Sequence, residues 1–80
     1  MAEVRKLSVI AREISVKWAN PSVHALPYLS AMTQVHTLQD KFYADDARSI
    51  VLYFLSNAGR WTGEDARRIK KELNEMLKAE

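Results

Sequence analysis

The chain has 80 residues, of which 48% are hydrophobic and 28% are charged, and its formal net charge is +2. This length and composition are typical of one small globular domain over residues 1–80, and they exclude a disordered tail. The sequence contains no cysteine, which excludes a disulfide framework and thiolate metal ligands. No segment has the one-sided positive charge that drives non-specific binding to nucleic acid.

The first of four expected helices runs from Glu3 to Ala19. Val9 and Val16 fall on its outer side, where either partial exposure or contact with a neighbouring helix is expected, with the seam of a homodimer as the alternative. Charged residues interrupt the segment throughout, so it is expected to be neither a signal peptide nor a membrane span, and a cytoplasmic location follows. Its core-facing residues recur at three- and four-residue steps: Val4, Leu7, Ile10, Ala11, Ile14 and Trp18.

A short second helix is expected from Pro27 to about Val35. A turn or a single helical turn follows over residues 37–43, and Leu38 and Phe42 are expected to fix it to the core. Nothing alternates with period two over a useful length, so no strands are expected. The inward residues of the second helix are Leu26, Leu29, Met32 and Val35.

The third helix, expected over residues 45–58, is apolar on nearly every side and should lie at the centre of the bundle. Asp45 or Asp46 caps its start, and the stretch Asn57-Ala58-Gly59 provides a stop that tolerates left-handed backbone. Its core-facing residues are Ala47, Ile50, Val51, Phe54, Leu55 and Ala58.

The last helix has the clearest start. Thr62 is the expected N-cap, Asp65 stands in the capping-box position, and Trp61 packs on Ala66 as a hydrophobic staple. The fold class that follows is all-α: a small single-domain bundle of about four helices around residues 45–58. The buried stripe of the last helix is Ala66, Ile69, Leu73, Met76 and Leu77.

The sequence offers no constellation suited to catalysis or to metal binding. His24 and His36 are too far apart to form a ligand pair on one helix. Asp45 and Asp46 are accounted for by helix capping, and the serines lack the glycines of a nucleophile elbow. We therefore expect no enzyme, no metal and no cofactor.

Two kinds of binding surface remain. One is nucleic-acid contact by a helix-turn-helix-like regulator, through Arg60 and the outer stripe of the last helix, namely Arg67, Lys71, Asn74 and Lys78. Against it, Glu64, Glu72 and Glu75 are interleaved with these cations, as on an ordinary solvated helix. The other is protein binding through exposed aromatic side chains, for which the candidates are Trp18, Tyr28, Tyr43 and Trp61, with burial in the core as the alternative for each tryptophan.

Several stretches of the chain resemble a family of short proteins from phages and prophages of Gram-positive bacteria. They are Ala11-Arg12-Glu13-Ile14, Trp18-Ala19-Asn20, Pro27 to Met32, and Ser49 to Leu73. The shared pattern is AREI, W-x-N, PYLxAM and SIVLYFLxNAxxWxGExARRIKxEL, over about residues 11–77, although Tyr43-Ala44 stands where that family has Tyr-Gly. The resemblance implies an accessory protein of a bacterial cytoplasm and no particular mechanism. The preferred hypothesis is a non-catalytic protein that binds a host or phage protein.

Overall fold

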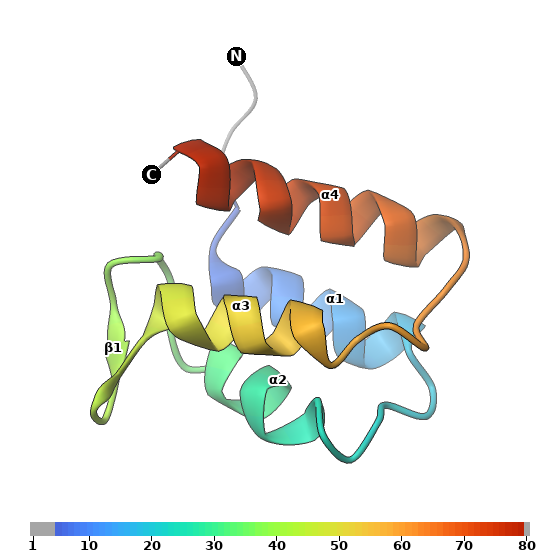
Figure 1. Ribbon diagram of the computed structural model, residues 1–80, viewed down its shortest axis with the longest axis horizontal. Helices are drawn as coiled ribbons and strands as arrows, with labels where there is room; N and C mark the ends of the chain where they lie inside the picture. Colours follow the sequence, from blue (N-terminus) through green and yellow to red (C-terminus); the bar gives the residue numbers. More distant parts are fainter. Residues whose placement is uncertain (1–4, 80) are drawn as a thin grey trace.

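The computed structural model describes residues 5–79 as four helices and one two-stranded hairpin (Figure 1). In chain order the elements are α1 (Leu7–Lys17), α2 (Leu26–Met32), β1 (Lys41–Phe42), β2 (Asp45–Asp46), α3 (Ala47–Ser56) and α4 (Glu64–Ala79). The expectation of a small, mostly helical domain is confirmed. The hairpin shows that the expectation of no strands is wrong. Each strand has only two residues, which is too short to give a period-two pattern in the sequence.

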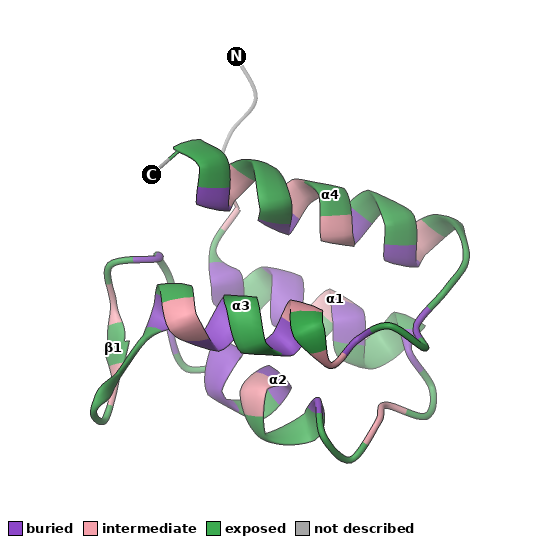
Figure 2. Ribbon diagram, in the orientation of Figure 1, coloured by how far each residue is buried: buried purple, intermediate pink, exposed green. Residues whose placement is uncertain are grey.

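The helices pack as a closed ring. The main contacts join α1 to α2, α2 to α3, α3 to α4, and α4 back to α1. Buried residues line the inside of this ring, and exposed residues line its outside (Figure 2). The largest fully buried side chains come from every helix and from the loop after α2: Phe54, Leu7, Ile10, Ile14, Met32, Ile69, Leu73, Val35 and Val51.

Helix α1 begins at Leu7, later than expected, and the predicted positions Glu3 and Val4 lie outside the described residues. No side chain caps this start; instead the backbone N–H of Leu7 donates to the carbonyl of His36 at 2.9 Å. The Ser8 hydroxyl and His36 Nδ1 lie 3.1 Å apart in a second hydrogen bond. A distant loop therefore accepts the hydrogen bond of the first free N–H group of α1. Local sequence patterns do not predict such a long-range bond.

Helix α2 is shorter than expected and ends at Met32, but Leu29 and Met32 are buried as predicted. Within the helix Leu29, Ala31 and Met32 are buried, and Ala25 at the N-cap extends this buried side four residues before Leu29. Leu26 was expected to face inward but is 44% exposed, because it is rotated away from that stripe. Val35 is buried as predicted, although it lies beyond the helix end in the following turn.

Helix α3 is not enclosed on all sides, which corrects the expectation that it lies at the centre. Phe54 is fully buried, but Leu52 and Tyr53 are 45% and 52% exposed on the outer side. Because each helix of the ring has two main neighbours, α3 keeps one face in solvent like the others.

Both ends of α3 differ from the predicted capping. Asp46 occupies the N-cap position without a side-chain hydrogen bond, since Asp45 and Asp46 pair in the hairpin instead. The N–H groups of Ala47 and Arg48 donate to the carbonyls of Asp40 at 2.8 Å and Leu38 at 3.3 Å. At the other end, Asn57 stops the helix without a left-handed backbone, and its Nδ2 donates to the carbonyl of Tyr53 at 2.8 Å.

Helix α4 begins at Glu64, which makes the prediction of Thr62 as N-cap wrong. Gly63 precedes the helix with φ +106°, and its carbonyl accepts from the N–H of Arg67 at 3.0 Å. Only glycine adopts that φ at little cost, so the chain turns one residue later than the capping pattern predicts. The predicted stripe is buried at Ala66, Ile69, Leu73 and Leu77, and Met76 is half-buried against the same core.

Candidate functional site

A continuous series of ion pairs joins α1 to α4. Glu13 accepts from Arg5 at 2.8 Å through one oxygen and from Arg68 at 2.6 Å through the other. Arg5 also binds both oxygens of Glu72, at 2.6 and 2.8 Å. We call this series the ionic chain, and its members in order are Lys17, Asp65, Arg68, Glu13, Arg5 and Glu72.

The ionic chain shifts the titration of its central members. Hydrogen bonds from Arg68 and then from Arg5 hold the pKa of Glu13 below its ordinary value. The hydrogen bond to Glu72 is the main reason that the pKa of Arg5 is raised, and the hydrogen bond to Glu13 raises the pKa of Arg68. These groups stay charged at neutral pH, and they fasten α4 to α1.

The predicted nucleic-acid residues all lie on exposed surface: Arg60, Arg67, Lys71, Asn74 and Lys78. Within residues 5–79, none of the four cations among them forms an ion pair. Glu72 was expected to lie among these cations but is drawn toward Arg5. The outer face of α4 is therefore more basic than the sequence spacing indicates.

The link between α3 and α4 bears on the helix-turn-helix hypothesis. It covers residues 57–63, which is longer than the three or four residues typical of that motif. The ammonium of Lys70 donates to the carbonyl of Trp61 at 2.6 Å, and burial lowers the pKa of Lys70. The link is therefore held against α4 by one of that helix's own side chains.

The two tryptophans lie inside the fold. Trp18 and Trp61 are 8% and 5% exposed, and their rings stack on each other. Of the four aromatic residues singled out for protein contacts, these two follow the core alternative and offer little surface to a partner.

The two tyrosines among those four residues lie apart. Tyr28 on α2 is half-buried and meets the exposed Tyr53 of α3, with ring centroids 5.5 Å apart. Tyr43 is 89% exposed at the tip of the hairpin, the highest exposure among the large hydrophobic side chains of the described part.

The hairpin holds Tyr43 in an uncommon backbone conformation. Lys41 pairs with Asp46 and Phe42 with Asp45, so Tyr43 and Ala44 form a two-residue turn. Tyr43 has φ +59°, in the left-handed region that two-residue hairpin turns usually reserve for glycine or asparagine. Phe42 packs against the core and meets the Tyr43 ring edge-on, with centroids 4.6 Å apart.

The loop before the hairpin is fixed by Asp40. One oxygen of this carboxylate accepts from the N–H groups of His36 and Thr37, at 2.8 and 3.2 Å, and the other from the Thr37 hydroxyl at 3.1 Å. The bond from the His36 N–H is the main cause that lowers the pKa of Asp40. These three hydrogen bonds therefore join the start of the loop to its end.

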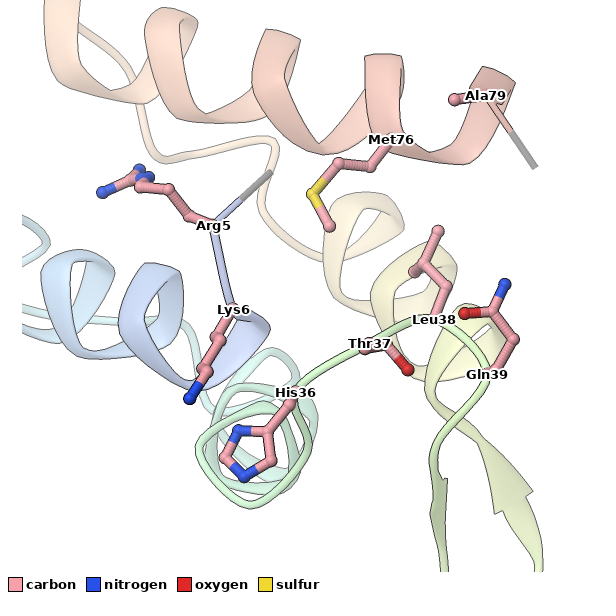
Figure 3. A pocket seen from close by; sticks show the side chains of 8 residues that line it. All are labelled: Arg5, Lys6, His36, Thr37, Leu38, Gln39, Met76 and Ala79. Carbon is pink, nitrogen blue, oxygen red and sulfur yellow. The ribbon is translucent and has the colours of Figure 1, made fainter. Parts of the chain in front are cut away.

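A pocket of about 270 Å³ opens beside this loop (Figure 3). We call it the end pocket, because it lies between the start of α1, the loop after α2 and the last turns of α4. Its members come from three distant segments, so no sequence spacing could have brought them together. They are Arg5, Lys6, His36, Thr37, Leu38, Gln39, Met76 and Ala79.

A second hollow, of about 400 Å³, lies between the loop after α1 and the link between α3 and α4. It brings together Trp18 and Arg60, which the sequence had assigned to two different hypotheses. Within the described part of the chain, no group of three or more His, Asp or Glu side chains is placed to hold a metal ion. Among the same residues no helix is both long and apolar enough to cross a membrane.

Comparison with known proteins adds no relative. No protein-family model, no curated protein and no solved structure matches this chain.

Proposed function

We propose that this protein acts by binding another protein, without catalysis, and that Tyr43 at the hairpin tip anchors the contact. The resemblance to phage and prophage proteins further suggests a host or phage protein of a bacterial cytoplasm as the partner. The observation that carries the proposal is the 89% exposure of Tyr43 at φ +59°.

The energetics of Tyr43 support this proposal. A left-handed conformation costs a residue other than glycine about 1–2 kcal/mol. Its aromatic ring also lies in water, where it contributes little burial to the fold. Strained residues concentrate at binding sites, and tyrosine is enriched among the side chains that dominate interface energies.

The surroundings of Tyr43 also suit an anchor. Phe42 is half-buried and fixes the base of the hairpin to the core, while its ring contacts that of Tyr43. The loop before the strand is held by Asp40. The Tyr43 ring is therefore already held in place, and a partner that binds it would lose little conformational entropy in ordering it.

A capture experiment with matched variants tests the proposal. The full chain, tagged and immobilised, is exposed to lysate of a Gram-positive bacterium beside Tyr43→Ser and Tyr53→Ser. We expect wild type and Tyr53→Ser to retain one common protein and Tyr43→Ser to lose it, because a central aromatic anchor contributes about 2 kcal/mol or more. With the purified partner this corresponds to a rise in Kd of about 30-fold. Capture of nothing above the bare resin, or equal capture by both variants, contradicts the proposal.

A second candidate is binding of nucleic acid by the outer face of α4. It is favoured by the exposure of Arg67, Lys71 and Lys78 and by the diversion of Glu72 to Arg5. Asn74 lies on the same face, where its Nδ2 donates to the carbonyl of Lys70 at 2.9 Å. Binding to phosphates by this face would weaken steeply as the salt concentration rises.

A further inference from the structure

We propose that the end pocket receives one bulky apolar side chain of the partner protein, from a segment in which acidic residues flank that side chain. This inference rests on the proposed protein-binding function and names the chemistry of the bound segment. The pocket and the hairpin lie at the same end of the molecule, since the loop that lines the pocket leads directly into β1 (Figures 1 and 3).

The size and floor of the pocket suit a side chain. Its volume of about 270 Å³ lies just below the range of about 300–1,000 Å³ that is usual for small-molecule sites. Leu38 and Met76 contribute apolar surface from opposite sides, one from the loop and one from α4 (Figure 3). Methionine adapts its shape to different apolar groups, which favours a site that accepts leucine or phenylalanine.

The charge of the pocket selects what lies beside that side chain. Arg5, Lys6 and His36 line it, and no carboxylate does so within residues 5–79. The charge of Arg5 is already balanced by Glu72 and Glu13, whereas Lys6 is exposed and has no ion pair among the described residues. Acidic groups of the partner would complement Lys6, and basic groups would be repelled.

The pocket is also formed in advance. The Leu7–His36 backbone bond joins the start of α1 to the loop, and Asp40 holds the loop through three hydrogen bonds. His36 Nδ1 lies 3.1 Å from the Ser8 hydroxyl, which fixes the imidazole against α1. A peptide entering the pocket therefore need not order these walls.

Peptide titration of the ¹⁵N-labelled full chain tests the inference. The probes are blocked five-residue peptides in which two glutamates on each side flank a central leucine, phenylalanine or alanine, together with a leucine peptide flanked by lysines. We expect the leucine and phenylalanine peptides with glutamates to shift the amide signals of residues 36–39 and of Met76. The alanine peptide and the lysine-flanked peptide should bind at least tenfold more weakly.

Two charge reversals locate the site. Lys6→Glu should raise the Kd of the leucine peptide with flanking glutamates by about tenfold, because the attraction between residue 6 and the glutamates becomes a repulsion. Arg12→Glu makes the same charge change on the exposed side of α1 and should leave Kd unchanged. Equal Kd values for all peptides, or equal weakening by both variants, overturn the inference.

Capture of the partner by Tyr43→Ser and by Lys6→Glu separates this inference from the proposed function. If Tyr43→Ser loses the captured protein while Lys6→Glu retains it at unchanged Kd, the protein-binding function stands and the assignment of the end pocket fails. If both variants bind the captured protein more weakly than wild type does, both proposals are supported. The peptide titration needs no captured partner, so failed capture does not obscure its result.

Discussion

The indole rings of Trp18 and Trp61 stack with centroids 5.5 Å apart and planes inclined by only 10°. Trp18 follows the last residue of α1, and Trp61 lies in the link between α3 and α4. Phe54 of α3 meets Trp18 edge-on, with centroids 6.3 Å apart. Three segments of the chain are therefore joined through one group of aromatic rings.

Removing Trp61 should loosen this junction. We expect Trp61→Ala to lower the free energy of unfolding by about 3–5 kcal/mol through lost burial and a cavity. In a double-mutant cycle with Trp18→Ala, the coupling should be about 0.5–1.5 kcal/mol, the usual value for an aromatic pair. Urea denaturation followed by circular dichroism measures both quantities, and additive losses would refute the stacking contribution.

Phe54 fills the middle of the ring of helices. It is fully buried, so Phe54→Ala should cost about 3–5 kcal/mol, close to the whole stability of a domain this small. The same truncation at the exposed Tyr53 serves as the control and should cost less than about 1 kcal/mol. Thermal melts distinguish the two, and equal melting temperatures would contradict the assigned core.

Tyr43 should be a liability for stability. Tyr43→Gly removes the strain of φ +59°, and we expect the free energy of unfolding to rise by up to about 1 kcal/mol. Ala44→Gly is the matched control: Ala44 has no positive φ, so this change should lower stability by a few tenths of a kcal/mol or more. A loss of stability with Tyr43→Gly larger than that of Ala44→Gly would argue against strain at Tyr43.

Acid should weaken the fold through its carboxylates. Because the pKa values of Glu13 and Asp40 are lower in the folded chain than in the unfolded one, the unfolded state binds more protons on acidification. The stability they contribute is complete above the unfolded values, near pH 4, and is lost as pH falls through the folded values. Glu13→Gln should therefore reduce stability at pH 7 and flatten its decline below pH 4. Denaturation at successive pH values checks this, and an unchanged decline would exclude Glu13 as a source.

Salt dependence tests the nucleic-acid candidate. If the outer face of α4 binds phosphates, replacing Arg67 and Lys71 by glutamine should reduce the slope of log K against log salt by about two, with the fold intact. Arg12→Gln, an exposed change on α1, should leave the slope unchanged. Absence of any gel retardation at low salt, with duplex and single strands, removes this candidate.

Sequence periodicity predicted the core well, because a helix repeats its buried face every three or four residues. Ile10, Ile14, Leu29 and Phe54 are buried as expected. The helix ends were predicted less well, since long-range partners decide them. The carbonyls of His36, Leu38 and Asp40 serve the starts of α1 and α3, and the φ of Gly63 displaces the start of α4.

The candidate binding surfaces were harder to predict from the sequence than the core, because tertiary structure determines which side chains form them. The sequence could nominate Tyr43 as an aromatic residue, but its exposure follows from a hairpin too short to leave a pattern. Spacing placed Glu72 among the cations of α4, whereas the structure pairs it with Arg5 across the fold. The end pocket combines three remote segments, which only their packing brings together.

The contact between the first and last helices constrains how the chain is assembled during synthesis. Arg5 and Glu72 are 67 positions apart, so their ion pair forms only after α4 has been made as far as Glu72. Until α4 emerges from the ribosome, the surfaces of α1 and α3 that it covers stay open to water. Translation adds roughly 5–20 residues per second, so a nascent chain passes through a stage of incomplete burial and completes its core late.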